Sequence, residues 1–143
     1  MNWGLIGVGA ALALAAVGSA LGAGSAGMAA VGAWKKCFVQ NKPAPFLLVA
    51  FVGAPLTQTI YGFILMNALN DARDSMDAAL LLGAGVLGGL AIGMSAWFQG
   101  KAAAVSSDAL AETGKGFGNY IIVLGLVETV ALFVMVFLLQ IAG

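Results

Sequence analysis

Glu128 is a single carboxylate inside a long apolar run that extends from Tyr120 to Leu139. At a rise of ~1.5 Å per residue, it lies roughly 13 Å from the start of that helix. This depth is close to the middle of a hydrocarbon layer about 30 Å thick. A carboxylate there costs on the order of 2.5–3.5 kcal/mol on insertion scales, which favours the hypothesis that it belongs to a functional site. The sequence therefore raises the question of what Glu128 binds.

A second polar group follows Pro55 in another apolar run. Thr57 and Tyr61 are separated by four positions and Gln58 and Tyr61 by three, so on a helix all three side chains can face one point. Pro55 has no N–H and disturbs the helix, which leaves nearby carbonyls, including that of Ala54, less engaged.

These groups, with Gln99 of a third run, form a set of oxygen ligands with low charge. Hard cations prefer oxygen ligands, and the single carboxylate balances a monovalent ion. A divalent ion would leave net positive charge in lipid, which disfavours calcium and magnesium. Tyr61 could donate its hydroxyl to the carboxylate and hold it in place.

Simpler roles exist for each residue except the acid. Gln58 and Gln99 could serve only as hydrogen-bond partners between helices. Thr57 could bond its own helix backbone, and Tyr61 could be a packing aromatic. A purely structural Glu128 is disfavoured, because no basic residue within the apolar runs could neutralise it.

The composition is that of an integral membrane protein. Of its 143 residues, 62% are hydrophobic and 8% are charged, against about 25% charged in soluble domains. The net charge is zero and histidine is absent, which argues against binding of nucleic acid or a transition metal. The single Cys37 allows no intramolecular disulfide and is interpreted as incidental.

Four apolar runs are each long enough to span a bilayer as a helix, which predicts an all-α membrane protein. The runs cover about 3–34, 45–69, 78–105 and 119–141. We interpret the first as a retained transmembrane helix rather than a signal peptide.

Polar stretches at 35–45, 70–77 and 106–118 separate the runs and are expected to be loops. The second carries residues that favour the start of a helix.

The chain is predicted to be an internal duplication of a helical hairpin. Residues 1–70 form the first hairpin and residues 71–143 the second, and the two run in the same sense. In this register Gln58 corresponds to Glu128, and Ala23 corresponds to Gln99. The two halves have therefore diverged at positions where an oxygen ligand would be useful.

Glycines concentrate in the first and third runs. Small residues at every fourth position allow helix backbones to approach closely in a membrane. Two such stripes occur, at Gly18, Gly22, Ala26 and Ala30, and at Gly85, Gly89 and Gly93. We expect the first and third helices to form a crowded inner layer, with the bulkier second and fourth outside; a plain four-helix bundle is the alternative.

Basic residues predict the orientation. Five of the six basic residues belong to or flank the first and third polar stretches, and Arg73 alone lies in the second. The positive-inside rule places loops 35–45 and 106–118 in the cytoplasm, with both termini and the 70–77 loop outside.

Together these motifs resemble the proteolipid of V-type rotary ATPases, which is the c-ring subunit and is called subunit K in sodium-pumping bacterial members. The resemblance covers essentially the whole chain. It rests on Pro55 to Phe63 of the second helix, Gln99 to Lys101 of the third and Val127 to Thr129 of the fourth.

The resemblance implies a ring of several copies in the lipid bilayer, turning against a stator membrane subunit and attached to central-stalk subunits. It implies no catalysis in this chain, since ATP chemistry belongs to other subunits. It assigns ion binding to Glu128 and a sodium-type ligand set, with a proton as the alternative ion. This set comprises Thr57, Gln58, Gln99 and the backbone carbonyl of Ala54, supported by Tyr61.

Two other functions are compatible with an acid in a membrane helix. One is an independent four-helix exporter that couples cations to protons; glycine-rich packing surfaces in place of an aromatic-lined cavity argue against it. The other is a passive pore or a purely structural protein, for which Glu128 would be dispensable.

Overall fold

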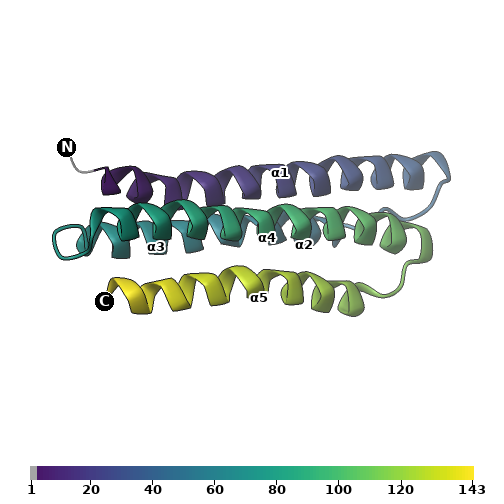
Figure 1. The fold of residues 1–143 in the computed structure, drawn as a ribbon. Helices are drawn as coiled ribbons and strands as arrows, with labels where there is room; N and C mark the ends of the chain where they lie inside the picture. Colours follow the sequence, from purple (N-terminus) through teal and green to yellow (C-terminus); the bar gives the residue numbers. More distant parts are fainter. Residues whose placement is uncertain (1–2) are drawn as a thin grey trace.

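The computed structural model describes residues 3–143, and all regular structure within them is helical. In chain order the elements are α1 (Gly4–Val39), α2 (Leu48–Gly53), the 3₁₀ turn η1 (Ala54–Leu56), α3 (Thr57–Asp71), α4 (Ala78–Thr113) and α5 (Phe117–Ala142) (Figure 1). Because α2, η1 and α3 follow one another directly, they act as one rod. Within the described residues, four rods are long and apolar enough to cross a membrane, as the sequence predicts.

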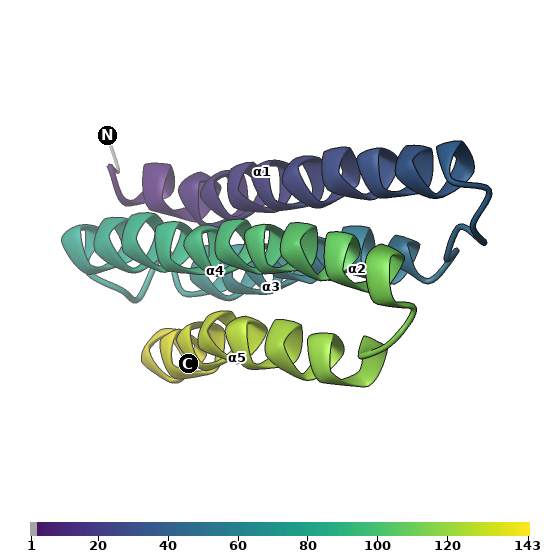
Figure 2. The ribbon, with the colours of Figure 1, turned by 90° about the vertical axis from the view of Figure 1, so that its right-hand side faces the viewer.

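The rods form two layers. α1 and α4 run in the same direction and pack most extensively on each other, whereas α3 and α5 run the opposite way (Figure 1). α3 contacts α1, α4 and α5, and α5 contacts α4 and α3. The connections at residues 40–47 (α1 to α2) and 114–116 (α4 to α5) lie at the same end of the bundle (Figure 2).

The polar stretches 35–45 and 106–118 are partly helical, which corrects the prediction that each is a loop throughout. α1 continues to Val39 and α4 continues to Thr113. Charged side chains outside lipid are good helix formers, so polarity marks where a helix leaves the apolar layer rather than where it ends. With 36 residues each, both helices are about 54 Å long and extend beyond a hydrocarbon layer of about 30 Å.

The extended ends of α1 and α4 are joined by ion pairs. The Lys36 ammonium lies 3.4 Å from a carboxylate oxygen of Glu112 and 4.0 Å from one of Asp108. All three side chains are largely exposed, so the pairs contribute little stability. They show that the two helices stay together beyond the apolar section.

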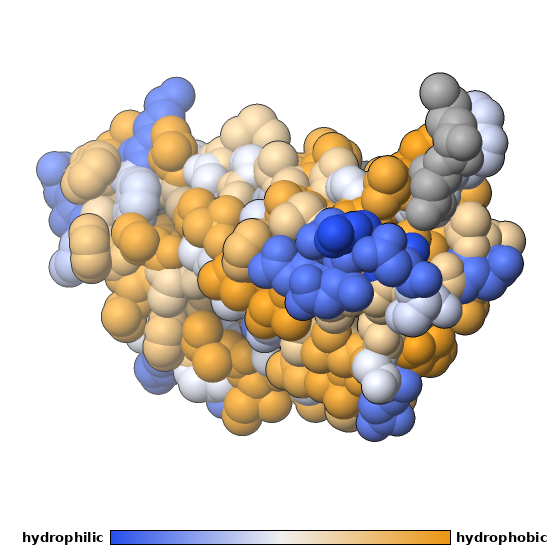
Figure 3. Space-filling model, turned by 90° about the vertical axis from the view of Figure 1, so that its left-hand side faces the viewer, coloured by the Kyte–Doolittle hydropathy of each residue, from blue (hydrophilic) through white to orange (hydrophobic). Residues whose placement is uncertain are grey.

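At the opposite end, α4 begins with the side-chain cap that the 70–77 stretch predicts. The Asp77 carboxylate accepts hydrogen bonds from the N–H groups of Ala79 (2.8 Å) and Leu80 (3.3 Å). Figure 3 views this end and shows a hydrophilic patch surrounded by apolar surface. The connection between α3 and α4 supplies charged residues here, including Arg73 and Asp74, which form an ion pair at 3.7 Å.

Backbone contact between α1 and α4 requires glycine at several positions, which confirms the predicted role of the two stripes. A Cβ on Gly18 would overlap the carbonyl of Gly93, and one on Gly85 would overlap the backbone of Gly7. Gly100 and Gly22 meet in the same way. Association through close backbone approach is a common way for membrane helices to pack without a hydrophobic driving force.

Two apolar clusters occupy the interior at different levels of the bundle. One contains Leu65 of α3 and Ile92 of α4, and the other contains Phe51 of α2 and Ala103 of α4. The fully buried Gln58 lies between these levels on the second rod. On α4, Gln99 likewise lies between Ile92 and Ala103, so the polar groups meet near the middle.

Substituting Gly18 with Ala tests the backbone contact. We expect Gly18→Ala to destabilise the protein by about 1–3 kcal/mol, because overpacking forces the α1 and α4 backbones apart. Thermal unfolding of the purified protein in detergent measures the change.

Gly32→Ala is the matched control on the same helix. A Cβ on Gly32 meets no atom within 4 Å, and Ala favours a helix over Gly by roughly 1 kcal/mol. Equal effects of the two substitutions would contradict the proposed packing role of Gly18.

Candidate functional site

Donors from two other helices surround the carboxylate of Glu128, which is partly buried on α5. One oxygen, Oε1, accepts hydrogen bonds from the Thr57 hydroxyl and the Tyr61 hydroxyl, each at 2.7 Å. The other oxygen, Oε2, accepts a bond from Nε2 of Gln99 at 3.1 Å. Thus α3 and α4 hold the two sides of the same carboxylate.

The amides of Gln58 and Gln99 form a fully buried pair. Nε2 of Gln58 donates to Oε1 of Gln99 at 2.7 Å. Nε2 of Gln99 donates to the backbone carbonyl of Leu124 at 3.0 Å as well as to Glu128. The pair links α3 to α4 and α4 to α5, so the site spans all three helices.

The helix break at Pro55 brings a backbone oxygen to the site. The 3₁₀ turn Ala54–Leu56 interrupts the second rod where the proline predicts a disturbance. The Thr57 hydroxyl oxygen lies 3.1 Å from the Ala54 carbonyl oxygen and 3.1 Å from Oε1 of Gln58. It lies 2.7 Å from Oε1 of Glu128. A hydroxyl has one hydrogen, so it cannot donate to all three acceptors at once.

In the part of the chain that the structure describes, Glu128 is surrounded by neutral hydrogen-bond donors and forms no ion pair with a Lys or Arg side chain. The ion pairs within residues 3–143 involve Lys36 and Arg73, which lie near opposite ends of the bundle. Within the same residues, no group of three or more His, Cys, Asp or Glu side chains could hold a metal ion. A cation held here would therefore depend on amide, hydroxyl and backbone oxygens together with one carboxylate.

The structure brings together the side chains that the sequence selects. Thr57, Tyr61 and Gln99 bond to Glu128 directly, and Gln58 reaches it through Gln99. The simpler roles also occur, because Thr57 contacts its own helix and the two amides pair between helices. Contacts that join the helices and contacts to the carboxylate thus belong to one hydrogen-bond network.

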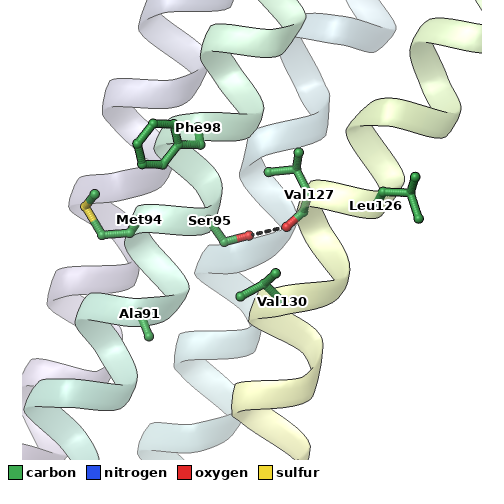
Figure 4. Close-up of a pocket in the computed structure, with 7 residues that line it drawn as sticks. All are labelled: Ala91, Met94, Ser95, Phe98, Leu126, Val127 and Val130. Carbon is green, nitrogen blue, oxygen red and sulfur yellow. Dashed lines mark hydrogen bonds between the residues drawn. The ribbon is translucent and has the colours of Figure 1, made fainter.

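The sequence interpretation missed one polar contact beside the site. Ser95 of α4 donates its hydroxyl hydrogen to the Val127 carbonyl at 2.8 Å (Figure 4). Ser95 lies one helical turn before Gln99 and therefore on the same face of α4, which is the signal that could have revealed it.

Comparisons with known proteins give two similarities for this chain. The family model for the C subunit of ATP synthase matches residues 82–141, which include Gln99 and Glu128. The chain is also similar to the A-type ATP synthase subunit K of Methanocaldococcus jannaschii, with 33% identity over 131 residues. This alignment covers 91% of the chain and 57% of the relative, so the chain spans a little over half of that protein's length.

A double-mutant cycle tests the amide pair. Gln99→Leu leaves the buried Gln58 amide without its acceptor, so we expect a destabilisation of about 1–3 kcal/mol. Adding Gln58→Leu removes the stranded amide, and the double variant should cost less than the sum of the two single changes. Thermal unfolding in detergent provides the four free energies.

Ser107→Ala combined with Gln58→Leu gives the reference cycle, because the Ser107 hydroxyl bonds only within its own helix, to the Ala103 carbonyl. Strict additivity in both cycles would show that the two amides do not depend on each other.

Proposed function

We propose that the chain is a c-subunit of the V/A-type rotary ATPases and forms a membrane rotor ring that carries a monovalent cation, with sodium favoured over a proton. Its similarity to the family model for the C subunit of ATP synthase and to an A-type subunit K supports this assignment. The observation that supports the proposal is the carboxylate of Glu128, set in an apolar helix and bonded by donors from α3 and α4. The subunit is not itself catalytic, and hydrolysis or synthesis of ATP belongs to other subunits of the complex.

The excess of acceptor oxygens around Thr57 supports sodium as the cargo. Oxygens of Ala54, Gln58 and Glu128 surround a hydroxyl that offers a single hydrogen. A small hard cation shared by these oxygens would satisfy the acceptors that the hydroxyl cannot serve. The single negative charge of Glu128 matches a monovalent ion.

In the proposed site, Glu128 supplies the charge and Thr57, Gln58, Gln99 and the Ala54 carbonyl supply neutral oxygens. For Gln99 this oxygen is Oε1, which the Gln58 amide already contacts. Tyr61 donates to the carboxylate and fixes its orientation. A carboxylate whose orientation is already fixed loses less conformational freedom when the ion binds, which favours binding.

Transport follows from the change in charge of the site. Ionised Glu128 takes an ion at the stator membrane subunit, and the resulting neutral complex tolerates contact with lipid. Rotation carries the complex back to the stator, where a basic group would draw Glu128 away from its ion. The ring consists of copies of this chain and turns with central-stalk subunits.

The proposed orientation in the cell membrane follows the basic residues. The connection at 40–47, which follows Lys36, and the connection at 114–116, which contains Lys115, face the cytoplasm. The α3–α4 connection faces outside. In the ring, α1 and α4 would form the inner layer and α3 and α5 the outer layer. The apolar surface of α5 would then face lipid, with Phe133 and Phe137 more than half exposed in the isolated chain.

Carbodiimide labelling of Glu128 tests the ion. Dicyclohexylcarbodiimide modifies protonated carboxyl groups in apolar surroundings, and an ion bound at Glu128 excludes the required proton. At neutral pH and a sodium concentration ten times its dissociation constant, we expect labelling to slow by about tenfold, because the free fraction falls by that factor. Mass spectrometry of the purified protein measures labelling at residue 128.

Potassium at equal ionic strength controls for salt, and Glu128→Gln should abolish labelling. Labelling that depends on pH but not on sodium would replace sodium with a proton as the cargo. The native mass of the purified protein separates a ring of many copies from a small exporter.

A further inference from the structure

Ser95 contacts the backbone of α5 directly beside the carboxylate. Its side chain is 6% exposed, and its hydroxyl donates to the carbonyl of Val127, the residue before Glu128, at 2.8 Å. Figure 4 shows this bond crossing from α4 to α5. The bond therefore fixes α5 at the residue adjoining the ion-binding group.

The choice of acceptor distinguishes Ser95 from other serines of α4. The hydroxyls of Ser106 and Ser107 bond to carbonyls four residues earlier in the same helix, at 2.8 and 2.9 Å. Such bonding within the helix is common for serine in helices. Ser95 instead bonds to a neighbouring helix, so its hydroxyl acts between elements.

Ser95 and Gln99 together hold α5 at two points. They lie one turn apart on α4 and bond to the carbonyls of Val127 and Leu124, respectively. Both carbonyls belong to the helical turn that precedes Glu128. Two bonds separated along the helix axis restrict the rotation and the axial position of α5, which a single bond would not do.

Apolar packing holds α5 only weakly at this level. Only Leu124, Ala131 and Met135 are buried among its 26 residues. Beside the Ser95 bond, a groove of about 600 Å³ lies between α4 and α5, lined mostly by apolar side chains (Figure 4). In the isolated chain the groove leaves this side of α5 without packed neighbours, so the polar bonds to α4 add to its restraint.

The internal duplication provides a comparison within the chain. Ser19 of α1 corresponds to Ser95 and is 2% exposed, but its hydroxyl has no hydrogen-bond partner among the described residues. Ala23 corresponds to Gln99 and has no polar side chain. The half without a carboxylate thus lacks both bonds, and the half with Glu128 has both.

We propose that Ser95 is a positioning residue that holds α5 in the rotation at which Glu128 meets Thr57, Tyr61 and Gln99, and thereby sets the affinity of the site for its cation. The proposal rests on the proposed role of Glu128 in carrying an ion. The three donors lie 2.7–3.1 Å from the carboxylate. A small rotation of α5 would move the carboxylate relative to the donors on both α3 and α4 and disturb these distances.

The test measures carbodiimide labelling of Glu128 in Ser95→Ala, using the purified ring. The readout is the sodium concentration that halves labelling at neutral pH, or the pH that halves it if sodium gives no protection. We expect Ser95→Ala to shift the half-protecting ion concentration about threefold or more, the size that corresponds to one interhelical hydrogen bond in a membrane protein. Ser95→Thr keeps the hydroxyl and should restore the wild-type value.

Ser19→Ala and Ser107→Ala are matched controls, because each removes a buried hydroxyl that makes no bond to α5. Both should keep the wild-type half-protecting concentration. Loss of thermal stability alone, with this concentration unchanged in Ser95→Ala, would assign Ser95 a structural role and overturn the proposal.

Ser95→Cys replaces Ser95→Ala if the alanine variant does not assemble. Its weaker donor should give an intermediate shift, and a wild-type value would overturn the positioning role while leaving the function of Glu128 intact. Failure of the proposed function is recognised separately, since wild-type labelling would then respond to neither sodium nor pH. That result would also remove the basis for the role of Ser95.

Discussion

A carboxylate held away from bulk water must have its charge compensated, and Glu128 depends on groups from two neighbouring helices for this. Thr57 and Tyr61 bond one oxygen and Gln99 bonds the other. α3 supplies the donors to one oxygen and α4 supplies the donor to the other, so the carboxylate needs both helices. The hydrogen bonds to the carboxylate therefore fix α3, α4 and α5 relative to one another. The buried amide pair adds a direct hydrogen bond between α3 and α4.

The contact between α1 and α4 provides the surface on which this arrangement is built. Glycine at the meeting points lets the two backbones touch, so the distance between these helices does not depend on side-chain rotamers. α3 is placed against this pair at Gly62, where a Cβ would press on Ala15 of α1. Pro55 packs beside Gly22 a short distance away. The segment that carries Thr57 and Gln58 is thus fixed on both sides.

Much of this could be predicted from residue types and spacing, and the failures have a physical cause. The spans, the cap at Asp77, the glycine contacts and the break at Pro55 follow from local chemistry or from periodicity along one helix. The ends of α1 and α4 did not, because polar composition reports the exit from lipid while helical structure continues past it. The Ser95 bond was missed because its acceptor is a backbone carbonyl on another helix. Every residue has such a carbonyl, so sequence does not indicate which one is used.

The α1–α4 pair should resist deformation more strongly than α5 does. α1 and α4 touch through backbone atoms along much of their length, which leaves few flexible side chains between them to absorb shear. α5 buries three residues and is attached near its middle by a few polar bonds. A sideways force applied at Glu128 would therefore displace α5 before it deformed the α1–α4 pair. In the proposed ring, torque would be borne mainly by the paired α1 and α4, and α5, which holds the acid, would deform first.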